Sequence, residues 1–453
     1  MSAIVANAQG RKNYDAIYSG VPWFNDHGKV VSAHGANIVN EKGKYYLFGE
    51  AHSDTSNAFA GINCYSSADL YNWKFEGEAL AVQDGGRLGR ARVGERPKVL
   101  KCKTGEYVML IHTDDLHYND ACVGYATSSN ISGPYVFRGP LLFNGSPIKK
   151  WDIGTFQDSD GSAYLLIHGG VLYKLANDYK SVAELVVDND WRGAEAPAMF
   201  KKDGTYFWLV SDLTGWERND NFYYTATSLK GPWTLRGTFA PKGKLTWNSQ
   251  TSFVLPVIGS KDTTFMFIGD RWSSPKQASA ATYVWQPLNI SGTTLSIPEY
   301  KEAWRINPAG RVRTKNTVKE MIIANGNKNS LSYSGHWNAD TLGVRSAFST
   351  KDSLIIRYKG AQAFLYGLSR PDGGYAYVNI YNSKGQLVIS GTIDTYCKYY
   401  VKTLSFLSPK LPNDSYTLTM SALGQHWSWI EKSGRRTGSK GNLISFDHLI
   451  VTN

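Results

Sequence analysis

Short apolar runs of strand length recur along the first two thirds of the chain, each opened by a glycine or a polar turn. Their starts are separated by 62, 56, 43 and 59 residues. Aromatic and aliphatic residues fill each run, which favours a buried strand over a helix. The five copies are Gly43–Phe48, Gly105–Leu110, Gly161–Leu166, Gly204–Leu209 and Thr263–Ile268.

A second phrase follows the first, second and fourth copies. It combines a Ser/Thr-rich strand, a polar turn and an aromatic residue, at Cys64–Trp73, Tyr125–Tyr135 and Thr225–Trp233. Units of about 45 to 60 residues with several strands each are typical of a β-propeller. A β-sandwich would also supply many strands, but it would not repeat one phrase at this interval. We therefore predict a five-bladed β-propeller over residues 15–310.

The repeat stops after Trp304. Residues 311–316 are polar and are interpreted as a linker. From residue 318 to 453, alternating strands and hairpin turns predict a C-terminal β-sandwich. Residues 1–14 are an N-terminal segment whose small residues suit either the remnant of an export signal or residues added for expression. The predicted fold class is all-β, a five-bladed β-propeller followed by a β-sandwich.

Composition excludes several classes of function. The 49 Lys and Arg exceed the 38 Asp and Glu and give a formal net charge of +11, but they form no basic block of the kind that marks a nucleic-acid arm. No apolar run approaches the roughly 20 residues that span a bilayer. The four cysteines are too few and too far apart for a disulfide framework or a zinc site, so no metal site is predicted.

The innermost strand of each predicted blade should precede its aromatic run and line the central channel. Counting back about ten residues from each run gives a polar position, and three of these positions are acids. One such acid would be a solvated turn residue, whereas three at the same phase indicate a site. The five positions are His34, Glu95, Asp152, Glu195 and Gln250.

Carboxylates that converge at a channel raise one another's pKa, as a general acid requires. Glycoside hydrolysis uses such groups to protonate the leaving oxygen and to manage the attacking water. Trp216, Trp247 and Trp272 are candidates for stacking on sugar faces, although a single Trp more often packs between blades.

Two phrases resemble glycoside hydrolase family 43, whose members are five-bladed propellers. These are Glu195–Phe200, similar to the acid motif, and Phe156–Leu165, similar to the third-blade motif. The resemblance implies that Glu195 is the general acid, that Asp152 tunes the pKa of Glu195 and orients it, and that the reaction inverts the anomeric centre.

Most of that family carries a base Asp on the first inner strand, where this chain has Gly35. The missing base, with Glu95–Lys98 and Asn248–Gln250, resembles the exo-β-1,3-galactanase branch. The branch implies that Glu95 binds the sugar 2-hydroxyl and that Gln250 positions the water. Because a neutral amide is a poor base, our hypothesis is that Gln250 holds the water by hydrogen bonds while Glu195 does the proton work, with passage of the amide through an imidic-acid form as one route. Further sugar contacts are expected from Glu50, Tyr118, Thr214 and the channel residue His34.

The expected activity is therefore exo-acting release of galactose from the non-reducing end of β-1,3-galactan, the backbone of arabinogalactan. Expected partners are β-1,3-galactan or arabinogalactan oligosaccharides, with no nucleic acid and no membrane insertion, and the expected state is a monomer. No cofactor is required, although the resemblance leaves room for a structural calcium ion. Because galactan lies outside cells, the protein is expected to be secreted, periplasmic or at the cell surface.

Two alternatives remain open. One is an α-L-arabinofuranosidase or β-xylosidase of the same family, and the other is a non-catalytic sugar-binding propeller. In the C-terminal region, Trp427, Trp429 and Tyr333 are candidates for polysaccharide binding, but packing against the propeller is the favoured interpretation.

Overall fold

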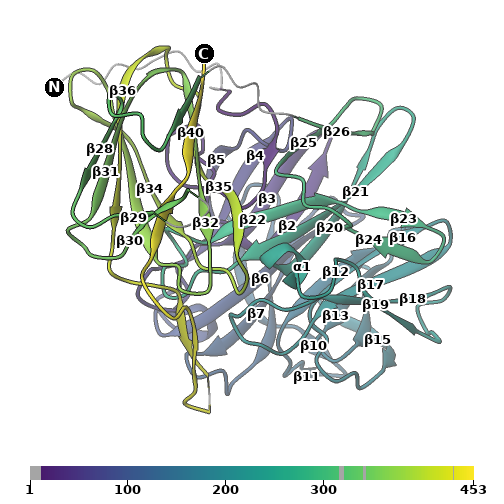
Figure 1. Cartoon of the computed structure of the whole chain (residues 1–453). Coiled ribbons are helices and arrows are strands. Elements are labelled where there is room, and N and C mark those ends of the chain that lie inside the picture. The colour runs from purple at the N-terminus through teal and green to yellow at the C-terminus, as the bar shows by residue number, and fades with distance from the viewer. Residues whose placement is uncertain (1–11, 316–320, 340–342, 432) are drawn as a thin grey trace.

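The computed structural model describes residues 12–315, 321–339, 343–431 and 433–453. In these ranges the chain is almost entirely β-structure (Figure 1), with one short helix, α1 (Leu245–Asn248), and one 3-10 turn, η1 (Gly86–Leu88). The all-β class is therefore confirmed. The first 11 residues of the predicted N-terminal segment lie outside the described residues.

Five antiparallel sheets follow one another along the chain. Each is a meander in which consecutive strands are neighbours. They are β2 (His34–Glu41), β3 (Lys44–Glu50), β4 (Ile62–Ser67) and β5 (Lys74–Leu80); β6 (Arg92–Lys101), β7 (Tyr107–Asp115), β8 (Cys122–Ser128) and β9 (Val136–Pro140); β12 (Ile153–Gln157), β13 (Ala163–Ile167), β14 (Val171–Leu175) and β15 (Val182–Asp188); β16 (Glu195–Lys202), β17 (Thr205–Ser211), β18 (Phe222–Ala226) and β19 (Thr234–Thr238); and β20 (Gln250–Ile258), β21 (Thr263–Arg271) and β22 (Thr282–Pro287). The third sheet is extended by β10 (Leu142–Phe143) and β11 (Ser146–Pro147).

The first strands of these sheets close a circle. β2 contacts β6, β6 contacts β12, β12 contacts β16, β16 contacts β20, and β20 contacts β2 again. Each aromatic run of the repeat forms the second strand of its sheet, β3, β7, β13, β17 or β21, as predicted. The polar residues that begin the first strands therefore converge on one region.

A separate apolar cluster fills the space between each pair of neighbouring sheets. Between the first and second sheets it includes Phe48 and Met109, and between the third and fourth it includes Leu166 and Trp208. Because sheets pack on both sides, the second strands are buried on both faces. This explains why their sequences are continuous apolar runs without alternation.

The C-terminal residues form two further sheets that pack face to face. One contains β27 (Met321–Ala324), β40 (His448–Thr452), β32 (Gln362–Ser369) and β35 (Val401–Leu407), and the other β28 (Leu331–Ser334), β31 (Ser353–Gly360), β36 (Asp414–Ala422), β33 (Tyr375–Tyr381) and β34 (Leu387–Asp394). The alternating burial of β31 and β36 matches the alternation read from the sequence. Smaller pairings involve β29 (Asn338–Ala339), β30 (Arg345–Ala347) and β39 (Ile444–Phe446), and β37 (Ser428–Ile430) with β38 (Arg436–Gly438).

The polar stretch that was interpreted as a linker is not a loose connection. Its centre is strand β26 (Val312–Thr314), which pairs with β25 (Ala303–Ile306), and β25 pairs in turn with β1 (Ile17–Tyr18). Val312 pairs with Ile306 across a turn. The polar strand β26 is therefore attached to its sheet through a single apolar residue. Asn316 lies outside the described residues. A two-stranded hairpin, β23 (Asn289–Ser291) with β24 (Thr294–Ser296), precedes this sheet.

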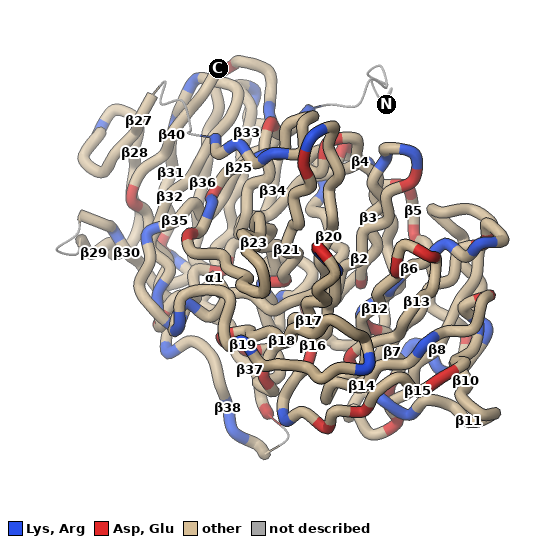
Figure 2. Tube along the Cα trace, turned by 90° about the vertical axis from the view of Figure 1, so that its right-hand side faces the viewer, with Lys and Arg blue, Asp and Glu red and all other residues tan. Residues whose placement is uncertain are grey.

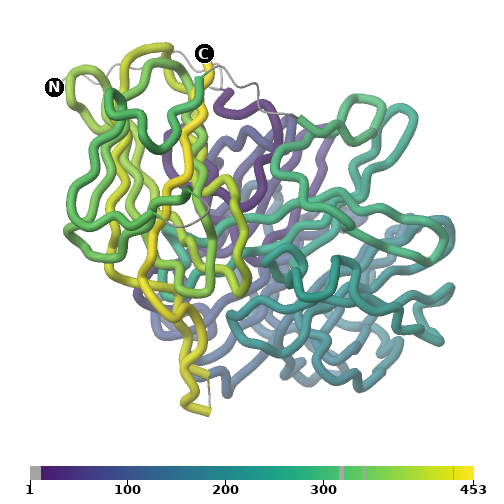
Figure 3. The backbone as a smooth tube through the Cα atoms, viewed as in Figure 1, coloured from purple at the N-terminus to yellow at the C-terminus, as the bar shows by residue number. Residues whose placement is uncertain are grey.

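One large core joins the two regions. It contains residues of the first and fifth sheets together with most of the C-terminal core. Phe24 packs edge-on against Phe406, and Tyr18 against Phe364, with ring centroids 5.8 Å apart in each pair. Figure 3 shows the C-terminal half in green and yellow directly beside the N-terminal strands in purple. All four cysteines are described, and each is buried and unpaired.

Within the described part of the chain, no helix has the length and apolar character needed to cross a membrane.

Candidate active site

A repeated backbone irregularity positions the polar ends of the first strands. In β2, β6, β16 and β20 the register to the second strand slips by one residue, and the slips in β2, β6 and β16 directly follow the first polar residue. Gly35, Arg96 and Ala196 lie in these bulges and have positive φ angles of 61°, 52° and 52°. A bulge of this kind redirects a side chain at the edge of a sheet. Glu95 and Glu195 immediately precede two of the bulges.

Asp152 has the phase that the sequence predicts, but its backbone differs. The N–H of His168 donates to the carbonyl of Asp152, so Asp152 faces the same second-strand position that Glu95 and Glu195 face in their sheets. β12 has no bulge, and Asp152 itself takes the positive φ, 49°, that Arg96 and Ala196 have in theirs.

Carboxylates hold the bulges to neighbouring sheets. The backbone N–H of Arg96 donates to Glu50 Oε1 at 2.7 Å, and that of Ala196 donates to Asp152 Oδ2 at 2.8 Å. The N–H of Gly35 donates in the same way to Asp270 Oδ2 at 3.1 Å. These bonds satisfy backbone donors that the bulges remove from the ladders.

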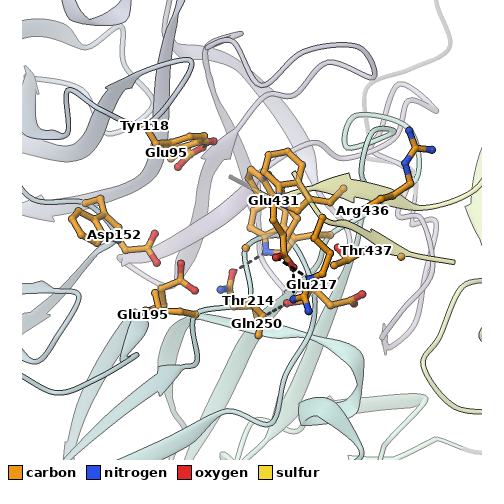
Figure 4. Close-up of a pocket in the computed structure, with 18 of the residues that line it drawn as sticks. Glu95, Tyr118, Asp152, Glu195, Thr214, Glu217, Gln250, Glu431, Arg436 and Thr437 are labelled. Atoms are coloured by element: carbon orange, nitrogen blue, oxygen red, sulfur yellow. Dashed lines mark hydrogen bonds and ion pairs between the residues drawn. The ribbon is translucent and has the colours of Figure 1, made fainter. Parts of the chain in front are cut away.

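The converging residues line a cavity of about 1110 Å³. Seven of the eight predicted site residues are on its wall, and Figure 4 shows several of them projecting toward one another. The seven are Glu50, Glu95, Tyr118, Asp152, Glu195, Thr214 and Gln250. The sequence reasoning therefore selected residues that the fold brings together from the edges of all five sheets and from two loops.

His34 is the exception, and its predicted contact with sugar is wrong. The His34 side chain is 1% exposed and does not line the cavity. Its ring stacks on Tyr283 with centroids 4.5 Å apart, and Nδ1 lies 3.1 Å from Asp270 Oδ1. Burial between the first and fifth sheets makes His34 a packing residue.

Glu195 has the environment of a proton donor. Burial raises its pKa well above the ordinary value, and the nearby charge of Asp152 raises it further. Its Oε2 atom is buried and has no hydrogen-bond partner among the described residues. A protonated carboxyl with a free oxygen in a cavity is suited to donate a proton to a substrate atom.

Asp152 remains ionised despite its burial. Burial alone would raise its pKa, but the Arg96 guanidinium, His112 and the N–H of Ala196 outweigh it and lower the pKa. Arg96 Nε donates to Asp152 Oδ1 at 2.7 Å. The two neighbouring carboxyls thus have pKa values shifted in opposite directions, which separates an acid from a charged partner.

Arg96 connects three parts of the site, and sequence reasoning assigned it no role. Besides Asp152, it reaches Gln250 Oε1 through Nη2 at 2.8 Å and the carbonyl of Thr251 through Nη1 at 3.3 Å. A single buried guanidinium can do this because its planar fork carries five donors. Arg96 thereby fixes β6, β12 and β20 relative to one another.

The Gln250 side chain is held in one orientation. Its Oε1 accepts from Arg96 Nη2 and from Trp272 Nε1, both at 2.8 Å, and its Nε2 donates to Ser211 Oγ at 3.0 Å. Because guanidinium and indole nitrogens only donate, the oxygen must face them. Both acceptor positions of Oε1 are occupied, and one N–H of the amide is left to face the cavity.

Glu95 is held by two side chains from its own sheet. The Tyr118 hydroxyl donates to Glu95 Oε1 at 2.7 Å, and His112 Nδ1 lies 3.3 Å from Oε2. Burial lowers the pKa of His112, but Asp114 and Glu95 outweigh burial and raise it to about 9. A charged His112 keeps Glu95 available as a hydrogen-bond acceptor.

The position of the usual base has no room for a side chain. A Cβ atom on Gly35 would lie 2.1 Å from Glu50 Oε1 and 3.1 Å from the Cα atom of Arg96. Gly35 also has a positive φ that favours glycine. The absence of an acid at this position is therefore built into the packing of β2 against β6.

Aromatic residues form much of the remaining wall. Trp216 and Trp272 line the cavity as predicted, with ring centroids 4.8 Å apart. Trp247 does not reach it, because its Nε1 donates to the carbonyl of Ile297 and its ring packs near Tyr300. Trp151, which sequence reasoning missed, lines the cavity and stacks on His168.

The C-terminal region also contributes to the wall. Trp429 lines the cavity and meets Trp216 edge-on, whereas Trp427 is fully buried. Tyr333 is remote from the cavity and packs against Trp337 and Arg345. Packing against the propeller, the favoured interpretation, fits Trp427, whose Nε1 donates to the carbonyl of Trp272. Tyr333 packs within the C-terminal region instead, and Trp429 also lines the cavity.

One sequence signal could have found more of the site. The sixth residue of each aromatic run, counted from its first apolar residue, is polar or charged in all five sheets. These residues lie opposite the polar residues that begin the first strands, and several bind site residues. They are Glu50, His112, His168, Ser211 and Asp270.

Comparison with known proteins agrees with this geometry. Residues 30–238 match the profile of the glycosyl hydrolases family 43. The crystal structure of a proposed exo-β-1,3-galactanase from Bifidobacterium bifidum is 37% identical, with a TM-score of 0.57, over 62% of this chain and 95% of that one. The chain belongs to glycosyl hydrolase family 43.

Two other members of the family extend the likeness. An exo-β-1,3-galactanase from Phanerochaete chrysosporium, solved with galactose, is 27% identical with a TM-score of 0.70 and covers 96% of this chain and all of its own. An exo-β-1,3-galactanase from Clostridium thermocellum is 28% identical with a TM-score of 0.60, over 75% of each chain. No curated protein matches the sequence. The family and these structures identify this protein as a glycoside hydrolase.

The residues at the centre of the sheets do not fit the calcium ion that the family resemblance allowed. No group of three or more His, Cys, Asp or Glu in the described ranges is arranged to hold a metal. The fully buried Lys98 donates instead from Nζ to the carbonyls of Gly35 and Ala36, at 2.6 and 3.2 Å. These carbonyl oxygens therefore already bind a side-chain amine.

Proposed function

We propose that this protein is an exo-acting, inverting hydrolase that releases galactose from the non-reducing end of β-1,3-galactan. The observation that carries the proposal is the pair Glu195 and Asp152, whose pKa values are shifted apart at the wall of a cavity. The substrate follows from the family members described as exo-β-1,3-galactanases, one solved with galactose and one variant of it with β-1,3-galactotriose.

In the proposed reaction, Glu195 donates its proton to the oxygen that leaves the terminal galactose. Asp152 holds Glu195 indirectly, through the N–H of Ala196, and keeps it protonated through its charge. Gln250 orients the attacking water through its remaining N–H. As the water oxygen bonds to the anomeric carbon and the bond from that carbon to the leaving oxygen breaks, the water's proton passes through solvent to the Glu195 carboxylate and restores the acid. The imidic-acid form expected from the sequence would put a proton on Oε1, where Arg96 and Trp272 already donate, so we retain the amide form.

Glu95, Glu50, Tyr118 and Thr214 are proposed to bind the terminal sugar. Glu50 Oε1 accepts from the backbone N–H of Arg96, and Oε2 lies 2.9 Å from His52 Nε2 without a hydrogen bond between them. The Thr214 hydroxyl donates to the carbonyl of Glu217 and accepts from Asn219 Nδ2 at 2.8 Å, which leaves it one further acceptor position.

For the fold, we propose that the circle of five sheets is a five-bladed β-propeller spanning residues 15–310. We propose that residues 318–453 are a β-sandwich domain. The closed contacts among the five first strands and the two packed C-terminal sheets support this division. We further propose that the protein acts outside the cytoplasm on galactan of arabinogalactan, and that it is a monomer.

The test is incubation with debranched β-1,3-galactan and with β-1,3-galactobiose, with products followed by chromatography and the first anomer by NMR. We expect galactose alone from the start, as the α-anomer. Glu195→Gln should lower turnover by at least about 10²-fold, because general acid catalysis is typically worth about 10²–10⁴-fold. Release of arabinose from native arabinogalactan without galactose would favour the arabinofuranosidase alternative, and binding of galactan without any product would favour the non-catalytic one.

A further inference from the structure

The hairpin of β37 and β38 forms one wall of the cavity although it comes from the C-terminal region. Trp429 on β37 pairs with Thr437 on β38, and both line the cavity with Arg436. In Figure 3 this hairpin is the yellow extension that reaches beyond the other C-terminal strands. A residue on it can therefore contact a substrate bound at the catalytic acids.

The hairpin is anchored to the catalytic region at its base. Trp427 Nε1 donates to the carbonyl of Trp272 at 3.1 Å, and the N–H of Ser428 donates to the carbonyl of Ser274 at 2.9 Å. Trp272 is also the residue that donates to Gln250. The hairpin and the catalytic residues thus share a support, which fixes the position of this wall.

Charge is distributed unequally over the cavity. The inner wall carries five acidic residues, of which Glu195 is the protonated one, and two cations, Arg96 and His112. The C-terminal wall carries four cations and one carboxylate, so it is the more positive of the two. The inner acids are Glu50, Glu95, Asp114, Asp152 and Glu195, and the C-terminal charges are Lys398, Arg435, Arg436, Lys440 and Glu431. In Figure 2 the backbone at β38 is blue, which marks these basic residues.

Two of the four cations have no compensating charge. Arg435 pairs with Glu431 at 2.7 Å, and Lys398 Nζ lies 3.8 Å from Glu217 Oε2. Arg436 and Lys440 form no ion pair with a described residue, and both are exposed. Figure 4 shows the Arg436 side chain on the side of the cavity opposite Asp152 and Glu195. The unpaired cations Arg436 and Lys440 therefore attract an anionic group to the C-terminal wall, whereas the acids of the inner wall repel it.

We propose that this outer part of the cavity, bounded by Trp429, Arg436 and Lys440, binds an acidic sugar residue carried on the galactan. The partly buried indole of Trp429 offers a face for a pyranose ring. A guanidinium binds a carboxylate through two parallel hydrogen bonds, so Arg436 suits a uronic acid. This inference rests on the proposed galactanase function and adds a preference for acidic side branches to it.

The experiment compares three substrates: β-1,3-galactobiose, the same disaccharide with a uronic acid side branch, and the branched form after carboxyl reduction. The reduced form keeps the size and hydroxyl groups of the branch and lacks only its charge. The readout is the ratio of kcat/KM for the acidic form to kcat/KM for the reduced form. We expect a ratio of about five at low ionic strength, because exposed ion pairs are each worth about 0.2–1 kcal/mol.

The ratio should fall toward one in Arg436→Gln/Lys440→Gln, and also in wild type at about 1 M salt, where the Debye length is about 3 Å. The matched control is Arg357→Gln/Lys359→Gln, which removes two exposed cations from β31 that do not line the cavity. The control should keep the wild-type ratio, which would show that net charge alone does not set it.

A wild-type ratio near one, or a ratio unchanged in Arg436→Gln/Lys440→Gln, would overturn the inference. Failure of the galactanase function looks different, because β-1,3-galactobiose itself would then not be cleaved. In that case calorimetric binding of the acidic and reduced forms still gives the ratio, so the two failures are distinguishable.

Discussion

Glu195 and Asp152 show how one pair of identical functional groups acquires two roles. Asp152 accepts from Arg96 and from a backbone N–H, whereas Glu195 keeps an oxygen without a partner. Hydrogen bonds to the charged form lower a carboxyl pKa, and burial beside a negative charge raises it. The pKa values of Glu195 and Asp152 thus differ because hydrogen-bond donors surround Asp152, whereas one oxygen of Glu195 has none.

Asp152→Asn tests this coupling through the pH profile. Glu195 must be protonated to act, so activity falls as pH rises through its raised pKa. Removal of the Asp152 charge lowers the pKa of Glu195, so the alkaline limb of kcat should move to lower pH. The measurement is kcat against pH for both proteins.

Asp212→Asn is the graded control, because the exposed Asp212 also raises the pKa of Glu195 but less than Asp152 does. Its alkaline limb should move in the same direction by a smaller amount. An alkaline limb that stays in place in Asp152→Asn would contradict the assignment of Glu195 as the titrating acid.

Gln250 offers a second test at the residue scale. Gln250→Ala removes the amide and should lower kcat by about 10²-fold or more if the amide orients the water. Gln250→Glu keeps an acceptor for Arg96 and Trp272 but loses the N–H, so it should also be impaired while its melting temperature stays close to wild type. Steady-state kinetics and thermal denaturation check both variants, and wild-type turnover in either one excludes the role.

At the scale of the strand, the bulges decide where the polar side chains point. Four first strands slip by one residue near their polar ends, and only β12 does not. A bulge is a local feature of backbone pairing, and an alternating pattern of side chains does not encode it. The sequence therefore predicts which residues begin the first strands but not the bulges that redirect their side chains.

Gly35→Ala should damage both stability and activity. A Cβ atom there would meet Glu50 Oε1 at 2.1 Å, and the positive φ adds strain of about 1–2 kcal/mol. We expect a lower free energy of unfolding in a denaturant titration and a loss of kcat/KM as Glu50 is displaced.

Gly43→Ala is the matched control for Gly35→Ala. Gly43 has a φ of 82°, but a Cβ atom there would meet nothing within 4 Å. It should therefore show the cost of backbone strain alone and keep wild-type kcat/KM. If Gly35→Ala and Gly43→Ala lost the same free energy of unfolding and the same kcat/KM, the predicted clash with Glu50 would be contradicted.

At the scale of the whole molecule, the C-terminal region is part of the catalytic structure. The buried Arg218 lies between Trp272 and Asp394, and the Tyr396 hydroxyl donates to Glu217 Oε2 at 2.9 Å. Burial raises the pKa of Asp394, and Arg218 partly offsets that rise. A shared core and buried polar contacts of this kind couple the folding of two regions.

We therefore expect one cooperative unfolding transition, with calorimetric and van't Hoff enthalpies that agree. Tyr396→Phe removes a bond to a buried carboxylate and should shift the whole transition downward, at a cost of about 1–3 kcal/mol. Tyr400→Phe, at a tyrosine that is 62% exposed, is the control and should leave the transition in place. Two transitions in the calorimetric scan, with only one affected by Tyr396→Phe, would show that the regions fold independently.

The order of residues was enough to predict the all-β class, the repeat of five units and most of the inner wall of the site. Strands buried on both faces must be apolar, and the residues that begin the first strands line the centre. A repeat read in phase therefore selects Glu95, Asp152, Glu195 and Gln250 directly. The resemblance of short motifs to the family added Glu50, Tyr118 and Thr214 to that set.

The tertiary structure decided the rest. Whether a polar residue such as His34 faces the cavity or a neighbouring sheet depends on packing across hundreds of residues, and the same holds for Arg96 and for Trp247. The wall contributed by Trp429 and Arg436 depends on contacts between regions distant in sequence, which no local pattern records. Long-range burial therefore determined which polar residues of the repeat became part of the site.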